Sequence, residues 1–330
     1  MFSLPRFAPI RSLLSTATLL AALLSSCATS PRPAPARFEF VDIHMGMDVR
    51  LVLHAATQPR ANAAADAAFR RIAELDALLS DYQPDSEVRR LEGRPGEWIP
   101  VSTDLFRVLT VALDVARATD GAFDPTAGPV IRLWRDARRT GVAPTPAEIA
   151  AALENVGWNR LELDSARQSI RYDASGFQLD LGGVAKGYIL QQALATLRNQ
   201  GVASAMVEAG GDIVVGDSPP GRPGWRIATP LAPPGIAERA ASLSNAALAT
   251  SGPTAQSFVI DGERRSHIVD PGSGQALTSR WVGTVIHPDA AVADALATAL
   301  SVLGEEGPAK LGVHFPDAVL SVLPAPPGLP

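Results

Sequence analysis

After about residue 37 the chain changes repeatedly between the periodicity of a strand and that of a helix, and the changes follow no regular order. Residues 38–53 alternate apolar and polar side chains, which predicts a strand pair or a bent strand. Residues 61–80 instead place Phe69, Ile72, Leu75 and other apolar side chains at helical spacing. Several later strand-like stretches lie close enough together to form hairpins. This irregular mixture favours an α+β fold over a doubly wound parallel sheet.

Local signals predict the remaining elements. Ser102 can cap a helix that runs to about residue 118. The segment Thr145-Pro146-Ala147-Glu148 has the form of a capping box with proline at the first helical position. One helix is expected to open after Gly182-Gly183 and to reach about residue 199, and a final helix is expected over about 291–303. Strands are expected at 168–172, 177–181, 205–209, 212–215, 225–228, 256–260, 266–269 and 282–286.

The N-terminus has the pattern of a bacterial lipoprotein signal. Arg6 and Arg11 precede an apolar run over residues 13–24, which is too short to span a bilayer as a mature helix. The residues Leu24-Ser25-Ser26-Cys27 then have the form of a lipobox. We expect a signal peptide over 1–26 and a lipid on Cys27; the alternative is a plain signal peptide with an incidental cysteine. The first reading places the protein in the bacterial cell envelope, anchored to a membrane and facing the periplasm.

The rest of the chain is expected to hold one domain. Residues 27–36 form a Pro/Ala-rich tether that is semi-rigid and extended. The domain is expected over 37–323, and the Pro-rich end over 324–330 is expected to be disordered.

Composition excludes several kinds of function. The formal net charge of the 330 residues is −5 and 19% of them are charged, which argues against a nucleic-acid binder with a basic surface. Cys27 is the single cysteine, so no intrachain disulfide can form. His and Cys do not cluster, so zinc and iron–sulfur sites are not expected. The chain also contains no Walker A, GxSxG or GxGxxG sequence.

The segment DLGGVAKGY at 180–188 is the strongest local signal. Two glycines allow a close backbone approach, and a helix N-terminus directly follows them. Lys186 lies in the first turn of that helix, where a cation is unfavourable against the helix dipole, which suggests an anionic ligand such as a phosphate. The alternative is a glycine turn followed by a solvated lysine.

The segment DALATALSVLG at 294–304 places a carboxylate and a hydroxyl on one helix face. Asp294 and Thr298 are four residues apart, so together they could bind a hard cation through oxygen. The alternative is an acidic residue that interacts with the helix dipole and a threonine that bonds its own backbone.

The segment SHIVDP at 266–271 carries the histidine with the densest polar surroundings. If the segment is a strand, Ser266, Ile268 and Asp270 share one face and His267 lies on the other. A structural histidine is the alternative to a catalytic one.

Taken in order, these motifs resemble the ApbE family of FAD:protein FMN transferases. The matching stretches cover nearly all of the chain after the tether. They are MGM (45–47), LLSDYQPDSEVRRLE (78–92), DGAFDPTAGPVIRLW (120–134), DLGGVAKGY (180–188), VEAGGDI (207–213), LATSG (248–252), SHIVDPGSG (266–274) and DALATALSVLG (294–304).

The resemblance implies an α+β, T-fold-like domain that binds FAD with Mg²⁺ and moves FMN onto a Thr or Ser hydroxyl of a target redox protein, with AMP as the leaving group. It implies that the metal is held by the Gly183 carbonyl, Asp294 and Thr298. The residues implied to line the FAD site are Met45, Tyr82, Ala122, Phe123, Asp124, Asp180, Lys186 and Ile268. Either Asp180 or His267 could accept the proton of the acceptor hydroxyl.

The chain departs from the family pattern at two places. Met47 stands where Thr is common, and Ser251-Gly252-Pro253-Thr254 stands where an acidic or aromatic pair is common after Ser-Gly. The second departure affects expectations about the acceptor. There are two rival functions. A hydrolase that gives FMN and AMP would share every motif with the transferase. A non-enzymatic flavin-binding lipoprotein is the other rival, and the metal set argues against it, because tight FAD binding alone does not require an ion.

Overall fold

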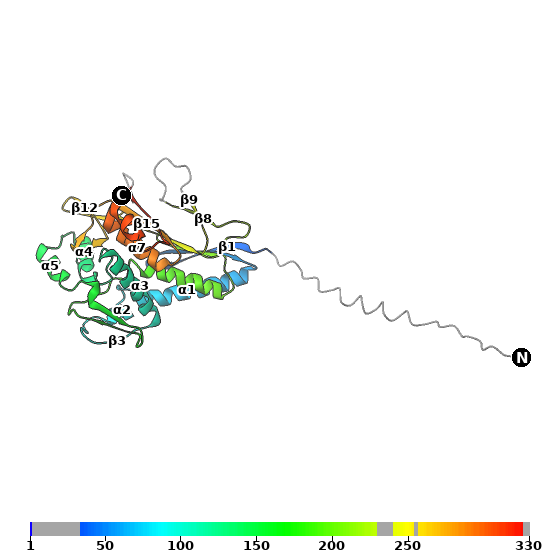
Figure 1. The fold of residues 1–330 in the computed structure, drawn as a ribbon, viewed down its shortest axis with the longest axis horizontal. Helices are drawn as coiled ribbons and strands as arrows, with labels where there is room; N and C mark the ends of the chain where they lie inside the picture. Colours follow the sequence, from blue (N-terminus) through cyan, green and yellow to red (C-terminus); the bar gives the residue numbers. More distant parts are fainter. Residues whose placement is uncertain (2–33, 230–239, 254–256, 326–330) are drawn as a thin grey trace. The chain divides into compact units, whose positions relative to one another are not determined.

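The computed structural model describes Met1 and residues 34–229, 240–253 and 257–325 (Figure 1). The described residues from Pro35 onward form one compact unit. The expected signal peptide, Cys27 and most of the tether over 27–36 lie outside the described residues. No helix in the described ranges is both long and apolar enough to cross a membrane.

The centre of the unit is a seven-stranded sheet in which every neighbouring pair is antiparallel. The residues expected as a strand pair over 38–53 form its edge hairpin. The α+β expectation is therefore confirmed. In spatial order the strands are β1 (Ala36–His44), β2 (Met47–Ala55), β6 (Ala205–Ala209), β7 (Asp212–Val215), β10 (Ala246–Ser251), β15 (Trp281–His287) and β16 (Val319–Pro324).

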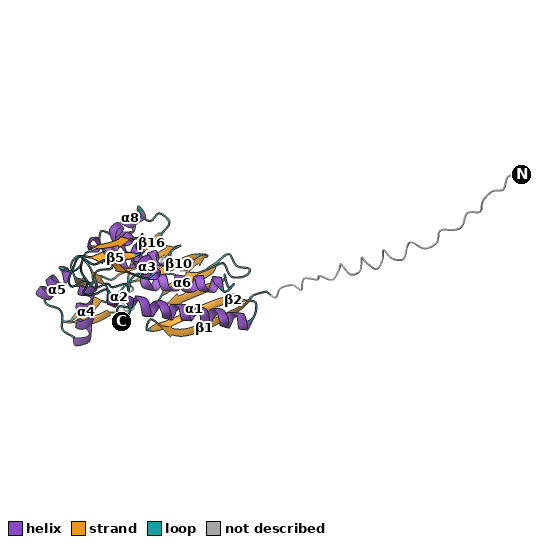
Figure 2. Cartoon of the chain, turned by 90° about the horizontal axis from the view of Figure 1, so that it is seen from below, coloured by secondary structure: helices purple, strands orange, loops and turns teal. Residues whose placement is uncertain are grey.

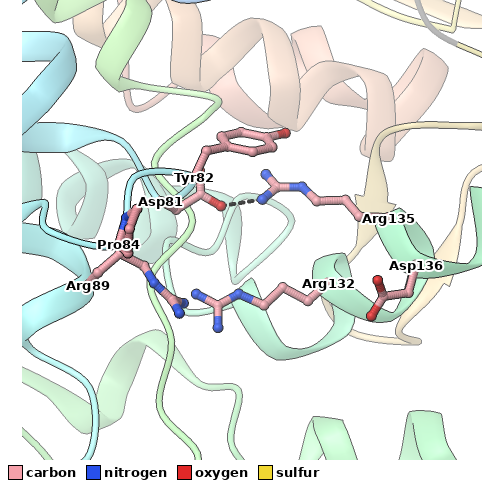
Figure 3. Close-up of a pocket in the computed structure, with 7 residues that line it drawn as sticks. All are labelled: Asp81, Tyr82, Pro84, Arg89, Arg132, Arg135 and Asp136. Atoms are coloured by element: carbon pink, nitrogen blue, oxygen red, sulfur yellow. Dashed lines mark hydrogen bonds and ion pairs between the residues drawn. The ribbon is translucent and has the colours of Figure 1, made fainter. Parts of the chain in front are cut away.

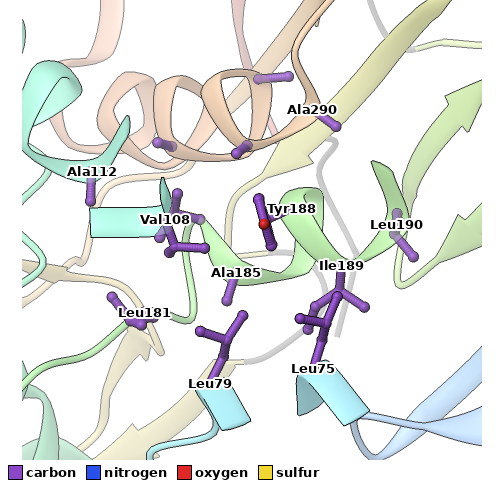
Figure 4. Packing of buried hydrophobic residues seen from close by; sticks show 14 of the residues in the cluster. Leu75, Leu79, Val108, Ala112, Leu181, Ala185, Tyr188, Ile189, Leu190 and Ala290 are labelled. Atoms are coloured by element: carbon purple, nitrogen blue, oxygen red, sulfur yellow. The ribbon is translucent and has the colours of Figure 1, made fainter. Parts of the chain in front are cut away.

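Four helices and one face of the sheet build the main core (Figure 2). They are α1 (Gln58–Leu79), α3 (Thr103–Thr119), α6 (Ala185–Asn199) and α7 (Ala290–Leu303). The apolar stripe of α1 buries Ile72, Leu75 and Leu79, as its period predicts. Figure 4 shows Leu75 of α1 close to Ile189 of α6, in the cluster that also includes Ala290 of α7.

The opposite face of the sheet is covered by the hairpin of β8 (Trp225–Ala228) and β9 (Ala240–Leu243). Trp225, Ile227 and Leu243 pack there on Val52 and Met206 of the sheet. The central strands are thus buried on both faces, whereas Val41 and Ile43 of the edge strand β1 stay exposed.

A third cluster lies around α4 (Gly128–Thr140) and α5 (Pro146–Leu153). Trp134 and Ile149 pack there against Val269 and Ala276. Four short strands contribute to this part, namely β11 (Ser257–Ile260), β12 (Glu263–Ser266), β13 (Val269–Asp270) and β14 (Gln275–Ala276). A separate three-stranded sheet has the order β3 (Ile99–Pro100), β5 (Ser169–Tyr172) and β4 (Leu161–Asp164).

The predicted caps are confirmed. The Ser102 hydroxyl accepts from the Leu105 amide at 3.2 Å at the start of α3. At the start of α5, Thr145 and Glu148 form both bonds of the capping box. The remaining short helices are α2 (Glu87–Arg90) and α8 (Gly307–Gly312).

Four expectations are wrong. Residues 177–181 belong to no strand, because the Asp180 amide donates to the Pro125 carbonyl (2.9 Å) instead of to a sheet neighbour. Phe177, Leu179 and Leu181 alternate with polar residues because they are buried, not because they belong to a strand. The strand expected over 266–269 is interrupted at His267 and Ile268, between β12 and β13.

The helix over 290–303 is not the last element, since α8 and β16 follow it. The tail expected over 324–330 begins too early. Pro324 pairs with Trp281, and the Ala325 amide donates to the Arg280 carbonyl at 2.6 Å.

Candidate active site

The three residues expected to hold a metal come together where α6 begins and α7 crosses it. A Cβ atom on Gly183 would lie 2.9 Å from the Thr298 hydroxyl oxygen, so the Gly183 backbone borders this side chain. The Gly187 amide donates to Asp294 Oδ2 at 3.0 Å. Asp294 and Thr298 are one turn apart on α7, as their spacing predicts.

Close approach of the two helices depends on Gly187. A Cβ atom at this position would lie only 2.1 Å from the Ala290 carbonyl oxygen and 3.0 Å from Asp294 Cβ. Only a residue without a side chain permits this distance. Gly187, the third glycine of the 180–188 segment, thus sets the position of Asp294.

Asp294 is a buried carboxylate, and its Oδ2 accepts the bond from the Gly187 amide. Burial, and secondly the charge of Asp212, raise its pKa to about 7, while Lys186 and the Gly187 amide act in the opposite direction. A divalent cation beside it would stabilise its charged form. Carboxylate, hydroxyl and carbonyl oxygens are the donors that Mg²⁺ takes in proteins. The residues present therefore fit a hard cation.

Lys186 is largely buried and forms an ion pair with Asp212. Its ammonium lies 2.7 Å from Asp212 Oδ2, and the side chains of the two residues are 19% and 4% exposed. Burial lowers the pKa of Lys186, but the carboxylates of Asp294 and Asp212 raise it by more, so the lysine stays charged. The anion beside Lys186 in this structure is a carboxylate of the protein itself, and the expected anionic ligand stays a prediction.

Sequence reasoning did not single out Asp212 as a site residue. It is the first residue of β7, and its Oδ1 accepts from the Thr250 amide at 3.1 Å. The sequence does carry a feature that could have identified Asp212: an acidic residue directly after a Gly-Gly turn and at the start of an apolar strand. This feature lies within the VEAGGDI segment at 207–213.

The hairpin between β1 and β2 reaches the same region. Its two-residue turn is Met45-Gly46, and both residues have positive φ (53° and 71°), as a type I′ turn requires. The Met45 amide donates to Asp76 on α1 at 3.2 Å. A Cβ atom on Gly210 would lie 2.8 Å from Met47 Sδ and 4.0 Å from Lys186 Cδ, so Met47 of the predicted segment and Lys186 both approach Gly210.

A second group of predicted residues is tied together by an arginine. Asp180 Oδ1 accepts from the Gly182 amide (2.9 Å), and Oδ2 accepts from Arg135 of α4 (2.6 Å). Arg135 also pairs with Asp81 and lies 4.3 Å from the centre of the Tyr82 ring. Burial raises the pKa of Asp180, and Arg135 opposes this shift.

Three of these residues, Asp81, Tyr82 and Arg135, border a pocket of about 310 Å³. Figure 3 shows Arg135 beneath the Tyr82 ring, with Arg89 and Arg132 directed toward each other across the pocket. Its lining residues are Asp81, Tyr82, Pro84, Arg89, Arg132, Arg135 and Asp136. The two groups are connected by the 180–183 loop, which carries Asp180 at one end and Gly183 at the other.

The predicted segment Ala122-Phe123-Asp124 packs on that loop. Phe123 is buried, and its ring lies 3.2 Å from the position of a Gly183 Cβ. Asp124 Oδ1 accepts from the Thr126 amide and hydroxyl (2.7 and 2.6 Å) and Oδ2 from the Trp158 amide (3.0 Å). The Asp124 carboxylate therefore fixes its own loop. Of the two predicted aromatic residues, Phe123 is buried and Tyr82 is 73% exposed, so Tyr82 is the one that a ligand can reach.

His267 is exposed, whereas its neighbours Ser266 and Ile268 are buried. Its segment packs on α4, because the Trp134 indole donates to the Gly274 carbonyl (2.8 Å) and Arg265 lies over the Trp134 ring (4.7 Å). The helix that carries Arg135 thus also supports the His267 segment.

Comparison with known proteins gives consistent matches. The model of the ApbE family matches residues 45–318. The FAD:protein FMN transferase of Vibrio cholerae is 34% identical over 246 residues, which cover 72% of each chain. The protein of the same name from Klebsiella pneumoniae is 33% identical over 249 residues, covering 71% of this chain and 70% of its own.

Solved structures agree with these matches. The ApbE protein of Thermotoga maritima has a TM-score of 0.76 at 30% identity, covering 88% of this chain and 97% of its own. The flavinyl transferase ApbE of Pseudomonas stutzeri has a TM-score of 0.74 at 27% identity, covering 88% and 96%. On the family match, the identities and the shared fold, this chain belongs to the ApbE family.

Proposed function

We propose that this protein transfers FMN from FAD to a Thr or Ser hydroxyl of target redox proteins and releases AMP. The observation that carries the proposal is the convergence of Gly183, Asp294 and Thr298 with the charged Lys186 at the start of α6. The FAD:protein FMN transferases of other organisms, at 30–34% identity, support it. Transfer forms a bond between the acceptor oxygen and the FMN phosphorus and breaks the bond from that phosphorus to the AMP oxygen.

The residues of the chain would divide the work as follows. Lys186 and the helix N-terminus would stabilise negative charge on the phosphates. Mg²⁺, held by Asp294, Thr298 and the Gly183 carbonyl, would supply further neutralisation of the pyrophosphate. His267 is exposed, so an acceptor hydroxyl can reach it, whereas the Asp180 side chain is only 8% exposed; His267 is therefore our choice for the group that takes the acceptor proton.

The test is to incubate the purified full chain with FAD, Mg²⁺ and the organism's own candidate acceptor proteins. We expect covalently bound flavin, seen by in-gel fluorescence, with AMP released in equal amount. Release of FMN and AMP without any labelled protein would instead support the hydrolase. Binding of FAD without turnover would support a flavin-binding lipoprotein.

The metal assignment has its own test. Asp294→Ala should remove Mg²⁺ dependence and activity while the fold survives. Unchanged Mg²⁺ binding in calorimetry would refute the assignment.

We also propose that Cys27 carries lipid and anchors the enzyme to a membrane of the bacterial envelope, facing the periplasm. The lipobox and the following Pro/Ala tether support this. A Cys27→Ala form should accumulate with its signal peptide uncleaved. Membrane attachment of a chain that begins at Ala28 would contradict the proposal.

A further inference from the structure

Arg135 follows directly after the matched segment 120–134, and it joins three separate parts of the chain. Asp81 and Tyr82 follow α1, Asp180 precedes α6, and Arg135 itself lies on α4. The Asp81 and Asp180 side chains are each 8% exposed, so the guanidinium satisfies two nearly buried carboxylates. One cation thereby fixes the ends of two loops.

The same guanidinium lies against the Tyr82 ring, with 4.3 Å between Cζ and the ring centroid. This distance is within the range of a cation–π contact. Tyr82 is nevertheless 73% exposed, so most of its ring remains accessible to a ligand. An aromatic ring that is held from one side and open on the other is suited to stack on a planar ligand.

We propose that Arg135 is a positioning residue for FAD: it orients the Tyr82 ring and the Asp180 carboxylate so that an aromatic ring system of FAD stacks on Tyr82. The inference rests on the proposed use of FAD as substrate. It assigns a binding role to a position outside the motifs that define the resemblance.

The neighbouring arginines provide a matched control. Arg132 lies one turn earlier on α4, lines the same pocket, and is exposed to a similar degree, with 26% against 31% for Arg135. It pairs with Glu92 at 2.6 Å, as does Arg89. Loss of Arg132 therefore removes a charge from the pocket without releasing Tyr82 or Asp180.

The experiment measures binding of FAD, riboflavin and AMP to the full chain by calorimetry, for wild type, Arg135→Gln, Arg135→Lys and Arg132→Gln. We expect Arg135→Gln to raise the Kd for FAD about tenfold, which corresponds to about 1.4 kcal/mol. Arg132→Gln removes one pocket charge alone and should raise the Kd for FAD by a clearly smaller factor than Arg135→Gln does. Arg135→Lys keeps the charge toward the carboxylates but lacks the planar guanidinium group. Its Kd for FAD should therefore lie between those of wild type and Arg135→Gln. Whichever of riboflavin and AMP shows the same loss identifies the ring that stacks on Tyr82.

A double-mutant cycle separates positioning from simple structural support. If Arg135 acts through Tyr82, Arg135→Gln should weaken FAD binding far less in a Tyr82→Leu background than in wild type. Full additivity, or an unchanged Kd for FAD in a folded Arg135→Gln protein, would overturn the inference. If Arg135→Gln does not fold, the Arg135→Lys cycle gives the same decision.

The outcome is distinguishable from failure of the proposed function. A wild-type protein that binds FAD with the expected Arg135 dependence but labels no acceptor would refute only the transferase. A wild-type protein that labels acceptors while Arg135→Gln binds FAD normally would refute only the role of Arg135.

Discussion

Gly187→Ala is the substitution that most directly tests how the fold places the candidate metal site. In an ordinary helix the change would stabilise the protein by about 1 kcal/mol, because alanine has the higher helix propensity. Here the new Cβ would lie 2.1 Å from the Ala290 carbonyl oxygen, which belongs to the backbone and cannot rotate away. A carbon–oxygen contact normally measures about 3.3 Å or more, so α6 and α7 must separate by roughly 1 Å.

The magnitude follows from these two opposing effects. Overpacking of a core costs about 1–3 kcal/mol, and a backbone clash this close belongs at the upper end. After the gain in helix propensity, we expect a net loss of about 2 kcal/mol in the free energy of unfolding. The loss in activity should be larger, since Gly187 also donates to Asp294 and a displacement of about 1 Å can reduce a rate about 100-fold.

The assay is chemical denaturation of the full chain together with the rate of FMN transfer over a range of Mg²⁺ concentrations. Gly312→Ala is the matched control, because a Cβ at that helical glycine would meet nothing within 4 Å. It should be neutral or slightly stabilising. A Gly187→Ala protein that is as stable and as active as wild type would refute the reasoning that this glycine sets the position of Asp294.

Three further predictions concern the buried charges. Asp212→Asn leaves the Lys186 ammonium without its ion-pair partner and should cost about 3 kcal/mol of unfolding free energy, measured by urea denaturation, whereas Asp114→Asn in the exposed pair with Arg117 should cost less than about 1 kcal/mol. Lys186→Gln should weaken FAD much more than riboflavin in calorimetry, because only FAD carries phosphates; equal losses would place Lys186 away from them. The pKa of Asp294 is raised from 3.8 to about 7, so in the metal-free protein the folded state keeps a proton on this carboxyl group that the unfolded state has already lost. The stability that this difference contributes is fully present below about pH 3.8 and is lost as the pH rises through about 7. The denaturation midpoint should therefore fall less between pH 4 and 7 in Asp294→Asn than in wild type. Stabilisation of the wild type by Mg²⁺ should weaken below pH 7, because protons compete with the metal for the carboxylate. Identical pH profiles of the two proteins would contradict this.

Much of the fold could be predicted because its signals are local. The helical period of α1, the serine cap of α3 and the capping box of α5 each depend on residues within a few positions. The shared face of Asp294 and Thr298 is likewise a property of helix geometry.

Elements whose identity depends on a distant partner were missed or misread. Residues 177–181 alternate like a strand, yet Asp180 pairs with the Pro125 carbonyl and no strand forms. The helix α4 begins at Gly128, whose backbone lies close to the Gln178 carbonyl group. A Cβ atom on Gly128 would lie only 2.5 Å from the Gln178 carbonyl oxygen. Such contacts join residues that are far apart in sequence, and no local pattern records them.

The sequence by itself determined the fold class, most of the helices and strands, the Asp294/Thr298 pair and the family resemblance, because each of these is encoded by spacing along the chain. Only the tertiary structure decided which charges meet. It paired Lys186 with Asp212, and it brought Arg135 against Tyr82 and Asp180. Ion pairs and ring contacts act over a few ångströms, so their partners are chosen by how helices and strands pack and not by their order in the chain.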